Sequence, residues 1–267
     1  MNEPIITSPQ NPRIKRLMQL QQKSSERRAE GLFVVEGARE LMHCIEAGYT
    51  VETIYFLPRL ASNLPPTVAR FIEQNPQRSL AVSETVYEKI AYRGSTEGVL
   101  AEVVARNISL DELVLPADPL LVVLEGVEKP GNIGAVLRSA DAAGVHAVIL
   151  CDTPTDLYNP NLIRSSLGAL FTVPCLACTS EQCIRFLKQN SIQILTAQLQ
   201  DSALYYDTDM RRPTALVMGT EATGLTDQWR QAADAHIRIP MLGQLDSLNV
   251  SVSTAILLYE AVRQRRS

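Results

Sequence analysis

Several polar side chains gather near the C-terminus, where a short apolar run leads through a turn into a helix start. Within residues 237–261, Ser247, Asn249 and Ser251 occupy the first positions of the segment with helical character. A helix start normally needs only one such side chain as its N-cap. The others could contact a ligand or hold a reacting group, so this segment is a candidate site.

A second candidate lies in residues 120–144, which read as a strand, a glycine-bearing loop and a helix. Asn132 lies at the mouth of this helix and Arg138 in its second turn. The glycines of the segment are spaced G-x4-G-x2-G, at Gly126, Gly131 and Gly134. This spacing lacks the tight turn of the G-x-G-x-x-G loop that binds dinucleotides. We therefore do not expect an NAD enzyme, although Asp152 ends the next strand.

A third candidate, residues 216–225, places Gly219 and Glu221 at the end of an apolar strand. The carboxyl ends of strands are where α/β sheets bind ligands. Glycine in such a loop lets the backbone approach a flat ligand closely. A carboxylate two residues later adds a group that can orient a ligand.

The elements that must position these segments alternate between helix and strand. In the first hundred residues, Ile14, Leu17 and Met18 recur at helical spacing, and strand-like apolar runs follow. Short alternating elements predict a small α/β unit. The strands are expected at 32–37, 51–57, 79–83 and 98–105, and further helices at 38–48, 64–74 and from a cap at Ser83.

Residues 106–118 contain two prolines and no clear periodicity, which predicts a linker. The chain would then divide into domains at 1–105 and 119–267. The second domain contains short continuous apolar runs, which suit a mostly parallel sheet covered on both faces. Its strands are expected near 120–124, 146–151, 192–197, 214–219 and 235–239.

Composition is that of an ordinary globular protein, with 46% hydrophobic and 20% charged residues among 267. The N-terminus lacks an apolar signal segment and no stretch reaches the length of a membrane span, so we expect a cytoplasmic protein without membrane contact. The net charge of −4 is unusual for a nucleic-acid binder. Residues 1–39, however, hold seven basic and four acidic side chains, so a polyanion would meet this segment first.

The three polar segments, in this order, resemble the motifs of the SpoU/TrmH family of RNA ribose methyltransferases, within the knotted SPOUT superfamily. The first motif, N-x-G-x-x-x-R, runs from Asn132 to Arg138, and the third, I-x-I-P-M-x-G-x-x-x-S-L-N-V-S, is matched throughout residues 237–251. The second departs in part, because many members carry further glycine where this chain has Ala222 and Thr223. Residues 33–48 resemble the N-terminal substrate-binding domain of many SpoU enzymes, a fold shared with some RNA-binding ribosomal proteins.

This resemblance implies a trefoil-knotted methyltransferase domain that works as a homodimer and transfers methyl from S-adenosylmethionine to a ribose 2′-hydroxyl. The implied catalytic residues are Asn132, Arg138, Glu221, Ser247 and Asn249. The implied cofactor-binding residues are Thr196, Ala197, Gly219, Ile239, Met241 and Leu248. No metal is required, because the sulfonium of the cofactor supplies the electrophile.

The role of Arg138 is open at this point. The family's usual assignment makes the arginine of the first motif the general base. A guanidinium hardly loses its proton in proteins. We therefore favour Arg138 as a clamp that grips the RNA phosphate and stabilises the developing alkoxide.

The substrate class follows from the resemblance, which favours large-subunit (23S) ribosomal RNA. A same-fold methyltransferase acting on transfer RNA or on a base is one alternative, and a non-catalytic RNA-binding or assembly protein is another. Arg164 could also reach a phosphate, although the segment around it could equally serve packing. The candidate RNA contacts are Arg13, Lys15, Arg16, Arg27, Arg28, Arg39 and Arg164.

Five cysteines in a chain without an export signal favour reduced thiols. Cys175 and Cys178 form a C-x-x-C, with Cys183 nearby. A structural zinc site needs four ligands, and the sequence offers no evident fourth because His146 and His236 are distant. The prediction is therefore small thiols packed on a strand and no metal.

Overall fold

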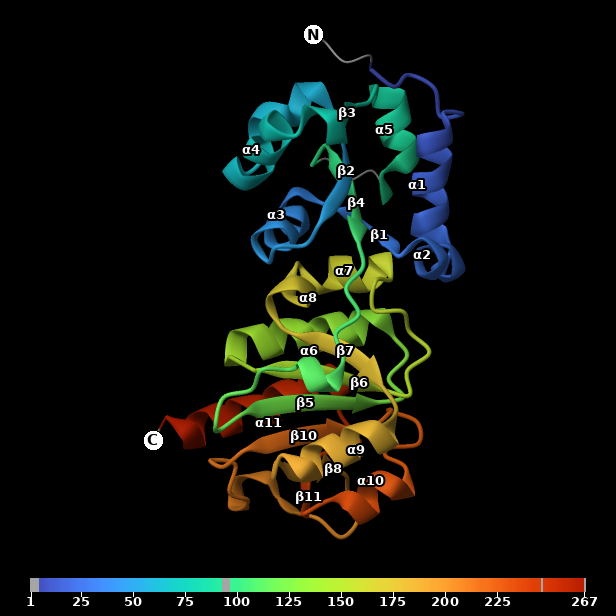
Figure 1. The fold of residues 1–267 in the computed structure, drawn as a ribbon. Coiled ribbons are helices and arrows are strands. Elements are labelled where there is room, and N and C mark those ends of the chain that lie inside the picture. The colour runs from blue at the N-terminus through green and yellow to red at the C-terminus, as the bar shows by residue number, and fades with distance from the viewer. Residues whose placement is uncertain (1–4, 93–96, 246, 267) are drawn as a thin grey trace. The chain divides into compact units, whose positions relative to one another are not determined.

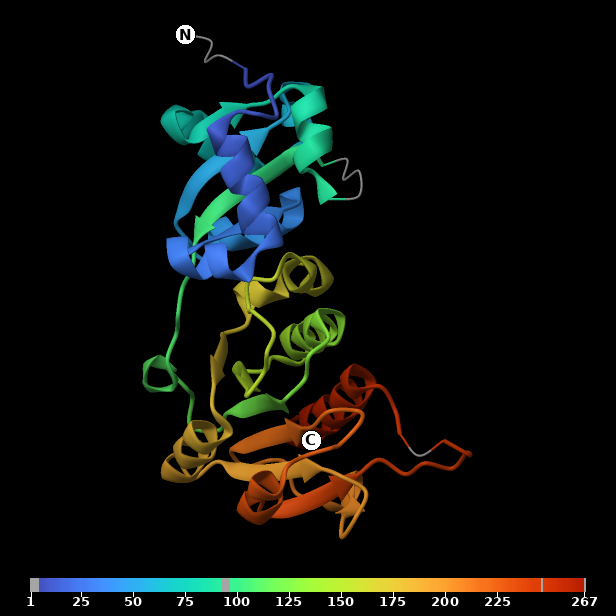
Figure 2. The same ribbon diagram turned by 90° about the vertical axis from the view of Figure 1, so that its right-hand side faces the viewer.

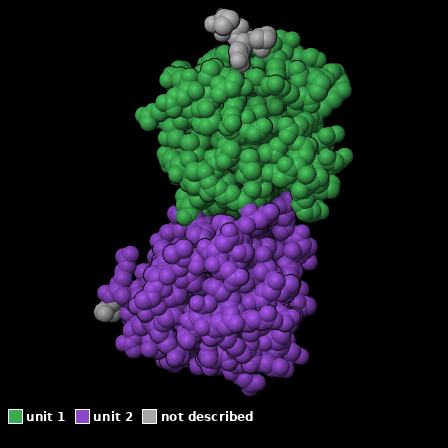
Figure 3. Space-filling view, in the orientation of Figure 1, with its two compact units in different colours: residues 1–106, 158–172 green, residues 107–157, 173–267 purple. Residues whose placement is uncertain are grey.

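The computed structural model describes residues 5–92, 97–245 and 247–266, which form two compact units (Figure 3). Unit 1 contains Met1–Arg106 together with Tyr158–Thr172. Unit 2 contains Asn107–Leu157 and Val173–Ser267. All three candidate segments fall in unit 2.

Unit 1 is built on a four-stranded sheet of β1 (Leu32–Glu36), β2 (Val51–Phe56), β3 (Ser79–Ala81) and β4 (Val99–Val104). The strand order is β1-β4-β2-β3, with β4 antiparallel to both neighbours and β3 parallel to β2. One face of the sheet packs on helix α1, whose Ile14 and Leu17 are fully buried as their helical spacing predicts, together with Leu20; Met18 is partly buried. The helices of the N-terminal part are α1 (Pro12–Gln22), α2 (Ser24–Glu30), α3 (Ala38–Glu46), α4 (Pro66–Gln74) and α5 (Glu84–Ile90), with short 3-10 turns η1 (Pro58–Asn63) and η2 (Pro76–Arg78).

Residues 158–172 form α7 (Pro160–Ser166) and α8 (Ala169–Thr172), which pack with the N-terminal residues of unit 1. Aromatic side chains hold them there. Phe33 of β1 stacks on Tyr158 with ring centroids 4.1 Å apart, and Phe171 lies 6.1 Å from the same ring of Phe33. The backbone nitrogen of Arg106 donates a hydrogen bond to the Tyr158 hydroxyl at 2.9 Å. We expected residues 119–267 to form one domain, and the sequence did not indicate that residues 158–172 would pack with unit 1.

Unit 2 contains a seven-stranded sheet in the order β7-β6-β5-β10-β8-β11-β9, and every neighbouring pair is parallel. The predicted parallel sheet is confirmed. Five of its strands were expected within about two residues of their observed ends. The strands are β5 (Leu120–Glu125), β6 (Ala147–Cys151), β7 (Cys175–Cys178), β8 (Gln193–Ala197), β9 (Ala203–Leu204), β10 (Thr214–Met218) and β11 (Ala235–Arg238).

Helices cover both faces of this sheet (Figures 1 and 2). One face packs on α9 (Ser180–Gln189) and α10 (Asp227–Ala232), where alternate strand residues join Leu187 and Trp229 in one apolar core. The other face packs on α6 (Pro130–Ala143) and α11 (Val250–Arg265), which also contact each other. Side chains that alternate along buried strands explain the continuous apolar runs in the sequence. Two further 3-10 turns are η4 (Leu110–Glu112) and η5 (Tyr205–Asp207).

Within the described residues, no helix combines the length and apolar character that a membrane crossing requires.

Candidate active site

The three polar segments meet at the carboxylate of Glu221. Its Oε1 accepts hydrogen bonds from the side-chain amides of Asn249 at 2.8 Å and Asn132 at 3.2 Å. The backbone nitrogen of Val250 lies 3.4 Å from the same oxygen. Residues from three distant parts of the sequence therefore converge on one acceptor, at the carboxyl edge of the parallel sheet.

Asn249 is the N-cap of α11, and this role fixes its amide. Its Oδ1 accepts hydrogen bonds from the Ser251 backbone nitrogen at 3.0 Å and the Ser251 hydroxyl at 2.6 Å. Because the oxygen faces the helix start, the amide nitrogen must point outward to Glu221 and to Oδ1 of Asn132, 3.2 Å away. Ser251, the third polar residue of this segment, thus holds the side chain of the N-cap residue Asn249 in place.

Lys129 also contacts this cluster and was not predicted. Its Nζ lies 3.6 Å from Oε2 of Glu221, although its side chain is 74% exposed. Lys129 is the N-cap residue of α6, three positions before Asn132. A cation at a helix N-terminus is unfavourable by itself, so the Glu221 carboxylate offsets it. Its position three residues before Asn132 was a signal in the sequence that Lys129 could join the site. A single exposed lysine usually contacts only solvent, so the signal is weak.

The loop that carries Gly219 and Glu221 is held by a buried carboxylate at the end of β5. Glu125 is only 5% exposed and accepts hydrogen bonds from the backbone nitrogen of Thr226 at 2.9 Å and its hydroxyl at 2.6 Å. At the start of the loop, a Cβ on Gly219 would lie 2.4 Å from the carbonyl carbon of Gly224. No side chain fits there, so glycine is required by the loop's own backbone rather than only by a ligand.

A cavity of about 380 Å³ opens beside this loop. Of the six residues predicted to bind the cofactor, Ala197, Gly219, Ile239, Met241 and Leu248 line it, as does Ser247. The sixth, Thr196, does not: it is fully buried, and its hydroxyl lies 2.6 Å from Nδ1 of His236. The lining also includes groups that were not predicted: Gln198, Leu199, Thr220, Leu225, Arg230 and Leu257.

A second cavity of about 350 Å³ lies on the other side of the same loop. Gly126, Lys129, Asn132 and Val250 line it, and Glu221 lines both cavities. The Glu221 carboxylate therefore stands between two spaces, and the polar groups of Lys129 and Asn132 line only the second. Such a pair of spaces can hold two reactants on either side of one acceptor.

Arg138 lies apart from this cluster and lines neither cavity. It follows Asn132 by six positions on α6, which corresponds to about 9 Å along the axis and about 120° around it. Its side chain is exposed, and no other described residue holds it by a hydrogen bond or ion pair. Arg138 is thus available to an external partner such as a phosphate.

The predicted RNA contacts in unit 1 differ in exposure and in their partners. Arg13, Lys15, Arg28 and Arg39 are exposed. Arg16 is engaged by Glu30 at 2.5 Å and by the buried Glu102 at 3.4 Å. Arg164 is exposed, stacks over Tyr92 at 4.1 Å and donates to Asn161 Oδ1 at 2.7 Å.

Arg27 is buried, which contradicts its assignment as an RNA contact. The residue is 5% exposed, and its guanidinium donates to the backbone oxygens of Leu20 at 2.6 Å and Gln21 at 3.3 Å. These carbonyls end α1, where helix carbonyls lack partners within the helix. Arg27 therefore joins α2 to the end of α1 and cannot also grip a phosphate.

The sequence matches two described protein families. Residues 119–259 match the SpoU rRNA Methylase family, and residues 11–101 match the MRM3-like substrate binding domain. The first match spans the parallel sheet and all three polar segments.

Individual proteins are similar to most of the chain. The 23S rRNA (guanosine-2'-O-)-methyltransferase RlmB of Bordetella pertussis is 38% identical over 214 residues, which cover 77% of this chain and 87% of that protein. The 23S rRNA (uridine(2479)-2'-O)-methyltransferase of Streptomyces viridochromogenes is 30% identical over 98% of this chain and 93% of its own length. A crystal structure of an AdoMet-bound rRNA methyltransferase from Sinorhizobium meliloti superposes with a TM-score of 0.88 at 29% identity, covering 97% of both chains.

Proposed function

The chain belongs to the SpoU rRNA methylase family, and from this premise we propose that it methylates a ribose 2′-hydroxyl of 23S ribosomal RNA. The methyl donor is S-adenosylmethionine. The observation that carries the proposal is the position of Glu221 between two cavities, joined there by Asn132 and Asn249. The similar proteins named above supply the substrate class.

The first cavity fits the cofactor. Its walls combine strand-end backbone at Ala197 and Gly219 with the apolar side chains of Ile239, Met241 and Leu248. Backbone groups can hydrogen-bond an adenine, and apolar side chains can pack on its faces. S-adenosylmethionine supplies an electrophilic methyl group on a sulfonium.

The second cavity would receive the target ribose. A ribose hydroxyl is a poor nucleophile while protonated, so it must be oriented and its proton accepted. The amides of Asn132 and Asn249 hold Oε1 of Glu221, which leaves Oε2, 3.6 Å from Nζ of Lys129, a residue that lines the second cavity. Glu221 can therefore accept a hydrogen bond from the 2′-hydroxyl, and Ser247, on the wall of the first cavity, can help to orient it.

Arg138 would bind the RNA backbone next to the reacting ribose. A planar guanidinium grips a phosphate through paired hydrogen bonds and keeps its charge. Its exposure and the absence of an ion pair to any described residue leave this fork ready for an external phosphate. We assign it to the clamp rather than to the general base.

The N-terminal residues 1–105 would recognise the RNA, followed by a linker at 106–118 and the methyltransferase domain at 119–267. Exposed cations at Arg13, Lys15, Arg28 and Arg39 support this division, as does the match of residues 11–101 to a substrate-binding domain. The protein would act in the cytoplasm, where ribosomal RNA is modified.

Two further features of the methyltransferase domain belong to the proposal. One is a homodimer: Val252, Ile256 and Tyr259 lie at four- and three-residue spacing on α11, and Val252 and Tyr259 are about half exposed. An apolar stripe on a helix normally packs against a partner. The other is a trefoil knot. Two observations support it. Strand β10 lies between β5 and β8 in the sheet, and the chain runs from β11 at the far side of β8 into α11, which packs on α6.

The experiment that tests the function compares ribose methylation across all RNA of a deletion strain and its parent. One or a few 23S positions should lose 2′-O-methylation and regain it from a plasmid copy, but not from a Glu221→Gln copy. Loss only in transfer RNA, or loss of a base methylation, would replace the substrate proposed here. An unchanged pattern would favour a non-catalytic RNA-binding role.

A further inference from the structure

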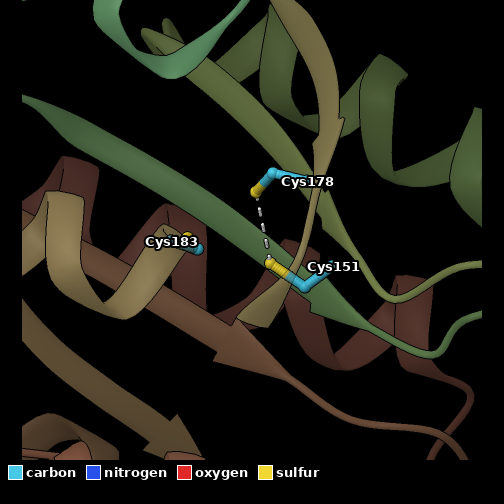
Figure 4. A group of neighbouring side chains, drawn as sticks. All are labelled: Cys151, Cys178 and Cys183. Carbon is cyan, nitrogen blue, oxygen red and sulfur yellow. Dashed lines mark hydrogen bonds between the residues drawn. The ribbon is translucent and has the colours of Figure 1, made fainter. Parts of the chain in front are cut away.

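Three thiols meet in unit 2, on the face of the sheet covered by α9, and none of the three cysteines lines either cavity. The sulfur atoms of Cys151, Cys178 and Cys183 all lie within 4.8 Å of one another, and those of Cys151 and Cys178 are 4.0 Å apart. Figure 4 shows Cys151 of β6 and Cys178 of β7 pointing toward each other, with Cys183 of α9 beside them. Neither the proposed reaction nor the motifs use them.

The trio differs from the C-x-x-C in the sequence. Cys175 and Cys178 are three positions apart on strand β7, and such residues face opposite sides of a sheet. Cys178 instead pairs in register with Cys151 of the neighbouring strand, so their side chains lie on the same face. Helix α9 covers that face and brings Cys183 from its first turns. The site is thus assembled by sheet register, which sequence spacing could not show.

The spacing of the sulfurs suits a shared metal ion. Thiolate sulfur lies about 2.3 Å from a closed-shell ion such as zinc, so three sulfurs around one ion are separated by about 4 Å. The Cys151–Cys178 distance already has this value. Small shifts of side chains, without backbone movement, would bring Cys183 to the same separation.

The number and type of the available ligand atoms indicate which metal ions could bind. Among the described residues, no histidine, carboxylate or fourth cysteine offers a ligand atom within the group. Asp152, the nearest carboxylate in sequence to Cys151, accepts a hydrogen bond from the Ser180 backbone nitrogen at 3.0 Å. Structural zinc sites and iron–sulfur clusters use four protein ligands. Three soft thiolates without nitrogen or oxygen ligands favour Cu(I) and chemically similar ions.

The N-terminal end of α9 can stabilise the negative charge of thiolates beside it. Cys178 directly precedes Thr179, the N-cap of the ten-residue helix α9, and Cys183 follows within the same helix. A helix N-terminus stabilises nearby thiolates. Cys151 and Cys183 are buried, whereas Cys178 is partly exposed and gives an ion a route from solvent.

We propose that Cys151, Cys178 and Cys183 form a three-thiolate site for a soft monovalent cation of the Cu(I) class. One ion would join β6, β7 and α9 at this corner of the sheet. Metal binding replaces three S–H protons, which are released to solvent, and involves no electron transfer.

The test uses the full-length protein, reduced and kept without oxygen, titrated with Cu(I) held by a competing chromophoric chelator. The wild type should take a single equivalent per chain from the chelator and show thiolate-to-metal absorption in the ultraviolet. Cys178→Ser, the change at the most exposed of the three, should weaken the affinity by at least about 10–100-fold, the loss typical even of residues that merely orient a ligand. Cys175→Ser is the matched control, since its sulfur lies outside the group, and should bind as the wild type does.

X-ray absorption of the loaded protein gives a second measurement that does not depend on the variants. Three sulfur neighbours around copper would support the site. Two sulfur neighbours, or nitrogen and oxygen neighbours, would overturn it. Equal uptake by wild type and Cys178→Ser would also overturn it and leave the thiols as packing groups.

Discussion

Asn249 donates a hydrogen bond of 2.8 Å to Glu221 while its amide oxygen caps helix α11. One side chain therefore starts the C-terminal helix and fixes the carboxylate between the two cavities. The helix start and the site geometry are coupled, so a substitution that separates the two roles is informative.

Asn249→Ser keeps a capping hydroxyl but loses the amide nitrogen that holds Glu221. We expect near-normal stability, because serine caps helices about as well as asparagine. Turnover should fall by about 10²–10⁴-fold, the range for a misplaced acid–base group. Asn249→Ala should lose turnover and also about 0.5–2 kcal/mol of stability with the cap. Denaturant melts and methyl-transfer rates measure the two effects, and full turnover in the serine variant would contradict the role given to the amide.

Gly219→Ala should damage the loop whether or not the cofactor is present. The added Cβ would lie 2.4 Å from the carbonyl carbon of Gly224, so the backbone must shift. We expect a loss of about 1–3 kcal/mol in the free energy of unfolding and weaker binding of S-adenosylmethionine.

Gly243→Ala serves as the control for this change, since no atom lies within 4 Å of its added Cβ. It should stay within about 0.5 kcal/mol of the wild type. Calorimetry without and with cofactor separates the effects. If the Gly219→Ala protein without cofactor were as stable as the wild type, the backbone of Gly224 would not lie close enough to Gly219 to exclude a side chain.

Arg138→Ala should remove most turnover and leave fold and cofactor affinity unchanged, because Arg138 is exposed and lines neither cavity. Loss of one preorganised donor commonly costs about 10²–10³-fold in rate. Arg138→Lys distinguishes the two mechanisms, since lysine loses its proton more readily but lacks the planar fork. Activity of the lysine variant that recovers at raised pH would point to a general base, and loss in both variants supports the clamp.

The neighbouring residues Arg27 and Arg28 should behave oppositely. Arg27→Ala removes a buried guanidinium that bonds the end of α1, at a cost of about 1–3 kcal/mol in stability. Arg28→Ala, at an exposed position, should leave stability within about 0.5 kcal/mol. It should weaken RNA binding and lower the slope of log affinity against log salt by about 1. A stable Arg27→Ala protein with weakened RNA binding would restore Arg27 as an RNA contact.

Much of the fold was predictable because β5, β6, β8 and β10 are mostly apolar runs, and β11 was also expected near its observed place. β9 was missed, since two residues carry too little periodicity to recognise, and β7 was anticipated only as the strand that carries Cys175 and Cys178. The site residues Asn132, Glu221 and Asn249 could be found from motif order, yet their contacts span 28 to 117 positions of sequence. These residues come together because β5 and β10 are neighbours in the sheet, which the sequence does not show.

Other features could not be predicted because the sequence reports residue type but not environment. Arg27 belongs to a basic run, and only packing shows that it is buried. Gly219 was predicted to let the backbone approach a ligand, and the nearby backbone of Gly224 is a second reason for glycine that the sequence did not show. Thr196 was predicted to contact the cofactor at its strand end, which stays a prediction, and the sequence did not show that its hydroxyl would lie 2.6 Å from Nδ1 of His236.

The most direct test of the central claim incubates the purified protein with methyl-labelled S-adenosylmethionine and unmodified 23S rRNA, followed by digestion to nucleosides. The proposal predicts label in a single 2′-O-methylated nucleoside, and none with Glu221→Gln. Glu181→Gln, a change to an exposed carboxylate on α9, should label as the wild type does. Label on a base, or no label from a protein that binds the cofactor and the RNA, would contradict ribose methylation as its function.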